Sequence, residues 1–192
     1  ASFETRRNEA QNEGWLLGLG LANSIEQAAG MFDEGGEIRF DRQGNATIHM
    51  GTHSHGQGHE TVFRQLLSEK LGLDFEAMRY VQGDTDLVGY GHGTGGSRVS
   101  GLGGGALLGA AEKIVEKGRQ IAAHSLEAPE VDIEFVDGQF TVAGTDRSLS
   151  LTDIAGIAFE PSLLPSGMDS GLQGFATFKA PAPTFPNACH VS

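Results

Sequence analysis

Two glycine-rich loops constrain this chain more than any other feature of its sequence. The first runs from Gly51 to Thr61 and carries three histidines among its glycines and hydroxyl residues. The second, residues 83–100, includes Gly93-Thr94-Gly95-Gly96-Ser97-Arg98, and each loop leads into a segment with helical spacing. The first N–H groups of a helix lack intrahelical partners and carry partial positive charge, so such loops can bind phosphate without lysine. The pair predicts a dinucleotide-sized ligand held by the backbone.

Composition narrows the class of protein. The 29 glycines among 192 residues are about twice the average usage and cluster around these loops. The net charge of −12 argues against a nucleic-acid partner, and no apolar run approaches the roughly 20 residues of a membrane span. One cysteine, Cys189, excludes an internal disulfide framework and an iron–sulfur cluster. We expect a cytoplasmic protein without membrane insertion and, since the first residue is not methionine, a piece of a longer polypeptide.

Periodicity predicts the elements around the first loop. The polar first ten residues are interpreted as the end of a helix that begins upstream, and residues 16–22 as a buried strand. Residues 37–40 and 46–50 alternate around a turn, which predicts a β-hairpin. Apolar residues at helical spacing predict a helix over 59–71 that stops at Gly72, followed by a strand over 78–82.

The second half is expected to begin with a glycine-rich helix capped by Ser97 or Ser100. Because each interior glycine costs about 1 kcal/mol against alanine, that helix should pack its backbone closely against a ligand or another element. Asp137-Gly138 predicts a second hairpin, and Ser150 the capped start of a short helix. The proline-rich residues 161–186 should be irregular, with a strand within 172–178.

The side chains of the loops leave alternatives open. His53, His55 and His59 could form a zinc site, or could be polar loop residues beside a ligand. Arg98 could pair with a phosphate, or with Asp84 or Asp86. No nucleophile with an adjacent base is apparent, and we assign no catalytic residue and no metal ligand.

The loops resemble those of the molybdopterin-binding large subunit of the xanthine dehydrogenase and aldehyde oxidase family. The branch of this family that the sequence resembles most includes the carbon monoxide dehydrogenase large subunit and bacterial N-heterocycle hydroxylases. The resemblance rests on four motifs in family order and spacing: Gly56-Gln57-Gly58-His59-Glu60-Thr61, Leu71-Gly72, Gly83-Asp84-Thr85-Asp86 and Gly93-Thr94-Gly95-Gly96-Ser97-Arg98. Residues 185–191 also resemble a family pattern, so the likeness covers most of the chain.

The resemblance implies a molybdenum cofactor, molybdopterin, with the bacterial-type motif favouring its cytosine dinucleotide. It also implies oxidation of an aldehyde, an N-heterocycle or carbon monoxide with water as the oxygen source. Electrons would leave through iron–sulfur and flavin subunits or domains of an oligomeric holoenzyme. Carried onto this sequence, the cofactor contacts are Gln57, Gly58 and Thr61 on one side and Thr94, Gly96, Ser97 and Ser100 on the other, whereas His59 and Glu60 only shape the loop.

The family's catalytic glutamate lies in a downstream Gly-x-Gly-Glu motif that has no counterpart here. We therefore expect residues 1–192 to be a single fragment of the cofactor-binding domain, inactive on its own, with an α+β fold of mixed and antiparallel strands and packed helices. Two other functions remain as alternatives: a non-redox nucleotide-binding or structural module, and a zinc hydrolase that uses His53, His55 and His59.

Overall fold

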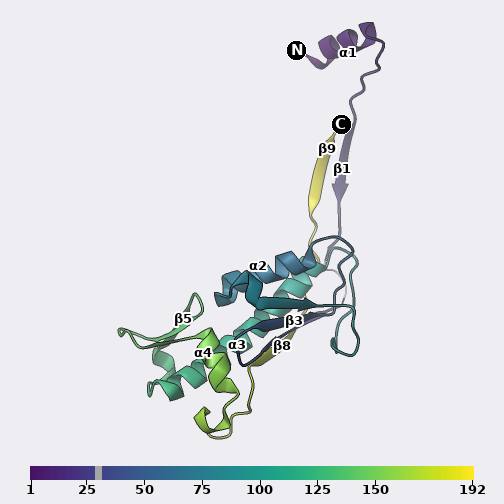
Figure 1. Cartoon of the computed structure of the whole chain (residues 1–192). Helices are drawn as coiled ribbons and strands as arrows, with labels where there is room; N and C mark the ends of the chain where they lie inside the picture. Colours follow the sequence, from purple (N-terminus) through teal and green to yellow (C-terminus); the bar gives the residue numbers. More distant parts are fainter. Residues whose placement is uncertain (29–31) are drawn as a thin grey trace.

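The computed structural model describes residues 1–28 and 32–192. The strands are β1 (Leu21–Ile25), β2 (Glu34–Phe40), β3 (Ala46–Met50), β4 (Met78–Val81), β5 (Ile133–Val136), β6 (Gln139–Val142), β7 (Ser148–Ser150), β8 (Gln173–Phe178) and β9 (Asn187–Val191). The longer helices are α1 (Phe3–Asn12), α2 (His59–Leu71), α3 (Gly104–Ser125) and α4 (Leu151–Ala158). Helices and mixed and antiparallel sheets combine as expected, which confirms the predicted α+β class (Figure 1).

A four-stranded sheet in the order β4-β3-β2-β8 forms the centre of the body. β2 pairs antiparallel with β3 and with β8, whereas β3 and β4 are parallel and are joined through α2. The predicted first hairpin is confirmed. Its turn is held by Asp41, whose carboxylate accepts hydrogen bonds from the amides of Gln43 and Asn45, both at 2.9 Å.

Helix α2 has the bounds that the sequence predicts. Its buried apolar stripe includes Phe63, Leu67 and Leu71, and the chain leaves the helix at Gly72 in the left-handed conformation, with φ of 65°. A Cβ at Gly72 would lie 2.3 Å from the backbone carbon of Asp137, so glycine is required there for space as well as for conformation.

Helix α3 packs so closely on the central sheet that glycines are needed on both sides of the contact. A Cβ on Gly174 of β8 would lie 2.3 Å from the carbonyl oxygen of Ala110, and one on Gly36 of β2 would lie 3.1 Å from the amide nitrogen of Leu107. A Cβ on Gly105 would lie 2.5 Å from the ring of Phe178. The predicted backbone-close packing of this glycine-rich helix is therefore confirmed, and its partner is the sheet.

A three-stranded antiparallel sheet, β5-β6-β7, lies at the far end of α3 (Figure 1). Its first turn is the predicted Asp137-Gly138, with φ of 47° and 77°. The short helix α4 follows β7, and Ser150 and Asp153 form a reciprocal capping box at its start. Both predictions are confirmed, as is the strand within residues 172–178.

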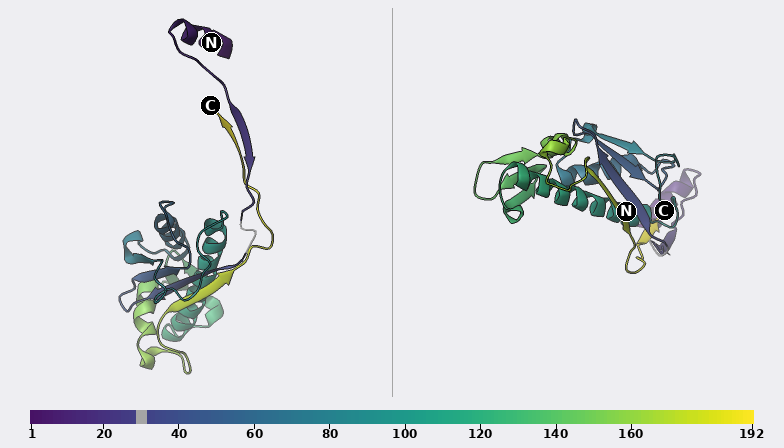
Figure 2. Two further views of the ribbon diagram at one scale, coloured as in Figure 1. Left: turned by 90° about the vertical axis from the view of Figure 1, so that its right-hand side faces the viewer. Right: turned by 90° about the horizontal axis from the view of Figure 1, so that it is seen from below.

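The first and last strands, β1 and β9, form a two-stranded antiparallel ribbon that projects from the body (Figures 1 and 2). The prediction of a buried strand over residues 16–22 is wrong: β1 begins only at Leu21, and every residue of both strands is exposed, because no other element among the described residues covers the ribbon. Helix α1 begins at Phe3, and the Ser2 side chain caps it by accepting a hydrogen bond from the amide of Thr5. That this helix begins further upstream stays a prediction.

Within the part of the chain that the structure describes, no helix combines the length and apolar character that crossing a bilayer requires.

Candidate functional site

The two glycine-rich loops meet because they leave the same edge of the central sheet. The first loop (residues 51–58) follows β3, the second loop (residues 82–98) follows β4, and these strands are parallel neighbours. His53 and Thr94 join the loops by two bonds: the His53 amide donates to the Thr94 hydroxyl at 2.9 Å, and that hydroxyl donates to the His53 carbonyl at 2.7 Å. The Ser54 amide donates to the Gln82 side-chain oxygen at 2.8 Å.

A cavity of about 510 Å³ opens between the loops, in front of the start of α2. We call it the loop cavity, and its lining residues are His55, Gln57, His59, Thr94, Gly95, Ser97, Arg98, Val99 and Ser100. Four of the seven cofactor contacts expected from the sequence are thus brought to one cavity: Gln57, Thr94, Ser97 and Ser100. Whether they contact a cofactor stays a prediction.

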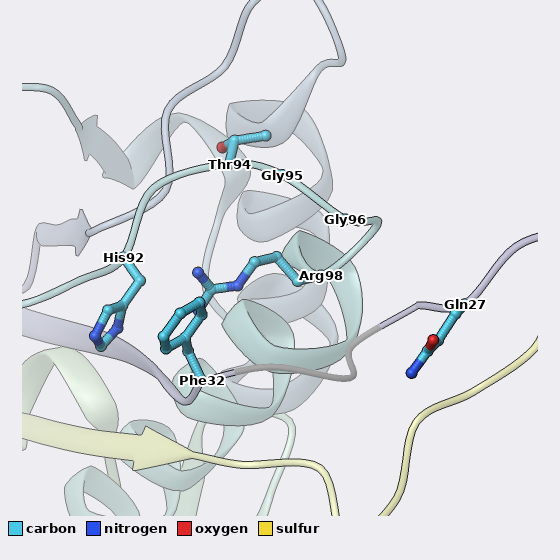
Figure 3. Close-up of a pocket in the computed structure, with 7 residues that line it drawn as sticks. All are labelled: Gln27, Phe32, His92, Thr94, Gly95, Gly96 and Arg98. Carbon is cyan, nitrogen blue, oxygen red and sulfur yellow. The ribbon is translucent and has the colours of Figure 1, made fainter.

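The other three expected contacts lie beside the cavity. Gly58 precedes α2 with φ of 79°, and Thr61 is the third residue of that helix, exposed on its surface. Gly96 lines a neighbouring cavity of about 360 Å³, which shares Thr94, Gly95 and Arg98 with the loop cavity (Figure 3).

The start of α2 supplies hydrogen-bond donors. Gly58 makes no side-chain cap, and the first amide with a partner inside the helix is that of Val62, which donates to the Gly58 carbonyl at 3.1 Å. The amides of His59, Glu60 and Thr61 have no acceptor among residues 1–28 and 32–192. They make this helix end suited to an anion.

Gln57 and Thr94 have side chains that shape the loops. The Gln57 side-chain oxygen accepts from the His55 amide and, at 3.4 Å, from the Ser54 hydroxyl, which leaves its amide nitrogen as the group available to a ligand. The Thr94 hydroxyl is engaged with His53, so Thr94 offers the cavity its methyl group and backbone.

His59 is more involved in the cavity than the sequence suggested. Only 7% of it is exposed, it lines the loop cavity, and its Nδ1 is buried without a hydrogen-bond partner in the described part of the chain. Burial lowers the pKa of His59, and charge on His55 and His53 lowers that pKa further. The spacing of α2 could have predicted this burial, because His59 lies four residues before Phe63 and so shares the buried face of the helix with Phe63 and Leu67.

The histidines do not converge on a metal. His53 Nδ1 and His55 Nε2 lie 3.2 Å apart as hydrogen-bond partners. No group of three or more His, Cys, Asp or Glu side chains within residues 1–28 and 32–192 is arranged to hold a metal ion. The geometry gives the zinc alternative no support.

Arg98 does not pair with Asp84 or Asp86, because its side chain turns inward. Its guanidinium lies 3.1 Å from the carboxylate of Glu34 and also donates to the carbonyl of Asp33. Phe32 stacks on the ring of His92, with centroids 5.2 Å apart, and lies beside Arg98 (Figure 3). The Tyr90 hydroxyl, which donates to the Asp33 carboxylate at 2.8 Å, holds the pKa of that carboxyl below its usual value.

The prediction that Ser97 or Ser100 caps the following helix is wrong. A π-helical turn over Val99–Gly103 precedes α3, and neither this turn nor α3 has a side-chain cap bond. Ser97 instead takes the left-handed conformation, with φ of 51°.

The backbone around Gly95 shows whether the loop cavity has room for a ligand. It lines both cavities, its φ lies outside the left-handed region, and a Cβ there would meet no described atom within 4 Å. Glycine is therefore required at this position neither by conformation nor by packing within the chain. The backbone at Gly95 is therefore open to a ligand, and His59, at the start of α2, lines the same cavity. The residues present thus fit a phosphorylated cofactor.

Comparison with known proteins decides which cofactor this is. The family described as molybdopterin cofactor-binding domain matches residues 1–192. The chain belongs to the molybdopterin cofactor-binding domain family. It is a cofactor-binding domain of carbon monoxide dehydrogenase and xanthine dehydrogenase-type enzymes.

Several larger proteins contain a segment that is similar to this molybdopterin cofactor-binding domain. The carbon monoxide dehydrogenase large chain of Hydrogenophaga pseudoflava is 35% identical over 196 residues, covering 95% of this chain and 24% of that protein. The nicotine 6-hydroxylase large subunit of Paenarthrobacter nicotinovorans is 32% identical over 204 residues, covering 99% of this chain and 25% of that protein. The solved structure of a Cu,Mo-CO dehydrogenase has a TM-score of 0.83 at 32% identity, covering 97% of this chain and 25% of that one. The chain spans about a quarter of the length of these relatives.

Proposed function

We propose that this domain forms one wall of the site that holds a molybdopterin cytosine dinucleotide in the large subunit of a molybdenum-dependent oxidoreductase. The observation that carries the proposal is the loop cavity: His59 at the start of α2 and Gly95 both line it, and the amides of residues 59–61 have no acceptor in the described part of the chain. Membership of the molybdopterin cofactor-binding domain family supports the choice of cofactor.

The residues of this chain would bind and orient the cofactor. The amides of His59, Glu60 and Thr61 would receive phosphate oxygens, as the N-terminus of a helix does for other anions. The side-chain nitrogen of Gln57 would donate to the pterin, and the hydroxyls of Ser97 and Ser100 would bind from the opposite wall. Gly58 and Gly96, which have no Cβ, would let the ligand approach the backbone.

The chemistry comes from the metal. A bound molybdenum cofactor supplies oxidation of an aldehyde, an N-heterocycle or carbon monoxide, with oxygen taken from water. We propose that His59 lines the cavity as an uncharged imidazole, because its lowered pKa disfavours the protonated form at neutral pH. We assign no proton transfer to this chain, and expect residues 1–192 alone, as a single cofactor-binding unit, to be inactive.

The rest of the enzyme follows from the same proposal. Iron–sulfur and flavin subunits or domains would remove the electrons, and the holoenzyme would be an oligomer in the cytoplasm. The names of the relatives, which act on carbon monoxide and nicotine, support a small-molecule substrate.

The test is the metal and nucleotide content of the full-length protein, purified with its accompanying subunits. We expect about one molybdenum per chain, and cytidine monophosphate on acid release. Zinc in molar ratio would favour the zinc hydrolase, and nucleotide without molybdenum would favour a non-redox binding module.

Gly95→Val adds a site-specific test. The substitution should lower the molybdenum content at least about tenfold, which requires the affinity to fall at least tenfold, or by roughly 1.4 kcal/mol. Gly18→Val is the matched control, because Gly18 also has open space around a Cβ and an ordinary φ but lies in the extended segment before β1. Equal molybdenum content in both variants would place the cofactor elsewhere.

A further inference from the structure

Glu34 is a buried charge to which the proposed function gives no role. Its side chain is 1% exposed, and that of its ion-pair partner Arg98 is 7% exposed. A carboxylate so far from water is tolerated only when it is paired and hydrogen-bonded. The position of this pair between the two loops suggests what it does.

The Glu34 carboxylate contacts both loops. The amide of His92, in the second loop, lies 3.3 Å from each of its oxygens, and the amide of Gly35 donates to Oε1 at 3.0 Å. Gly51 begins the first loop, and its Cα lies against that of Gly91 in the second. A Cβ on either glycine would lie 2.7 Å from Glu34 Oε1. The carboxylate therefore lies where the two backbones touch.

Arg98 fixes the far end of the second loop on the same carboxylate. Its guanidinium lies 3.1 Å from Glu34 Oε2 and donates to the carbonyl of Asp33. The stretch from Thr94 to Ser97, which forms a wall of both cavities, is thus held at both ends, by His92 before it and by Arg98 after it (Figure 3).

We propose that Glu34 is a positioning residue for the cofactor: by binding His92 and Arg98, its carboxylate sets the distance between the Thr94–Ser97 wall and the start of α2. This inference rests on the proposed function. A glutamine cannot replace the carboxylate. It has one acceptor oxygen, and its NH2 group would face the N–H groups of His92 or Arg98.

The experiment compares Glu34→Gln, Arg98→Met and the double variant in the full-length protein with its accompanying subunits. Glu37→Gln is the control, because Glu37 lies on the same strand but pairs with Arg39, which is exposed. Three quantities are measured: molybdenum per chain, thermal unfolding of the cofactor-free protein, and amide exchange of peptides that cover residues 88–100.

We expect both single variants to lower the unfolding temperature, to retain at least about tenfold less molybdenum, and to exchange faster over residues 88–100. The double variant removes both buried charges, so it should recover most of the unfolding temperature while its molybdenum content stays low. Glu37→Gln should match the wild type in all three.

Two results would overturn the inference. One is unchanged molybdenum content and exchange in the single variants. The other is a double variant in which molybdenum content recovers together with the unfolding temperature, since the pair would then serve stability alone. A wild-type protein without molybdenum would refute the proposed function instead, and exchange over residues 88–100 would still decide whether Glu34 holds the loop.

Discussion

Replacing Gly174 by alanine tests whether the spacing between α3 and the central sheet depends on glycine. The new Cβ would lie 2.3 Å from the carbonyl oxygen of Ala110, about 1 Å closer than an ordinary contact, and 3.3 Å from Ile114 Cγ1. The obstacle is backbone, so it cannot rotate away. Overpacking of this kind costs about 1–3 kcal/mol. For a protein of this size, each kilocalorie lowers the unfolding temperature by about 2–4 °C.

The matched control is Gly156→Ala, inside α4. A Cβ there has its nearest neighbour, the carbonyl oxygen of Arg42, at 3.6 Å, which is an ordinary contact. Alanine should therefore stabilise the helix by up to about 1 kcal/mol. Thermal and urea unfolding of the two purified variants measure the difference. If Gly174→Ala is as stable as the wild type, the close approach of α3 is not what requires glycine, and the reasoning fails.

Three further predictions concern pH, capping and cofactor. Burial lowers the pKa of His59 in the folded state below the value of about 6.5 that it has in the unfolded state. As the pH falls below about 6.5, the unfolded state therefore binds more protons at His59 than the folded state does. The free energy of unfolding should therefore fall as the pH drops from 7 to 5, and a His59→Gln variant should show a flatter curve in urea titrations over that range. Ser150→Ala removes the capping box of α4 and should cost about 1 kcal/mol by urea unfolding, whereas an equal loss in Ser148→Ala would argue against the cap. Removing the cofactor should lower the unfolding temperature of the wild type, and a comparable decrease in Gly95→Val would contradict the placing of the ligand in the loop cavity.

Local chemistry made much of this fold predictable from sequence. Gly72, Asp137-Gly138 and Ser150 each mark a backbone conformation that few residues adopt or stabilise, so α2, the β5–β6 hairpin and α4 were located closely. The two loops were also recognisable, because the residues that line the loop cavity cluster in two short segments.

Contacts between distant residues were not predictable in the same way. Nothing near Arg98 in the sequence indicates Glu34, because the two meet only when β2 lies beside the second loop. The apolar residues 16–22 suggested burial, but periodicity cannot tell which element would cover them, and no element that the structure describes does so. The residue type of Ser97 led us to expect a helix cap. In the structure, Gly96 and Ser97 both have a left-handed backbone conformation, and no side chain caps the helix that follows.

The ribbon of β1 and β9 has a consequence for the order in which the chain folds. Leu21 pairs with Val191, and Ile25 with Asn187, so this ribbon joins segments near opposite ends of the sequence. Pairings of such high sequence separation form late, because their loop-closure entropy is lost before any contact compensates for it. During synthesis β1 must wait until β9 has been made, and Trp15, Leu16 and Leu19, just before β1, are exposed in the folded structure as well. Until β9 arrives, the backbone N–H and C=O groups along the paired edge of β1 lack their partners, and such an unpaired strand edge can pair with another chain.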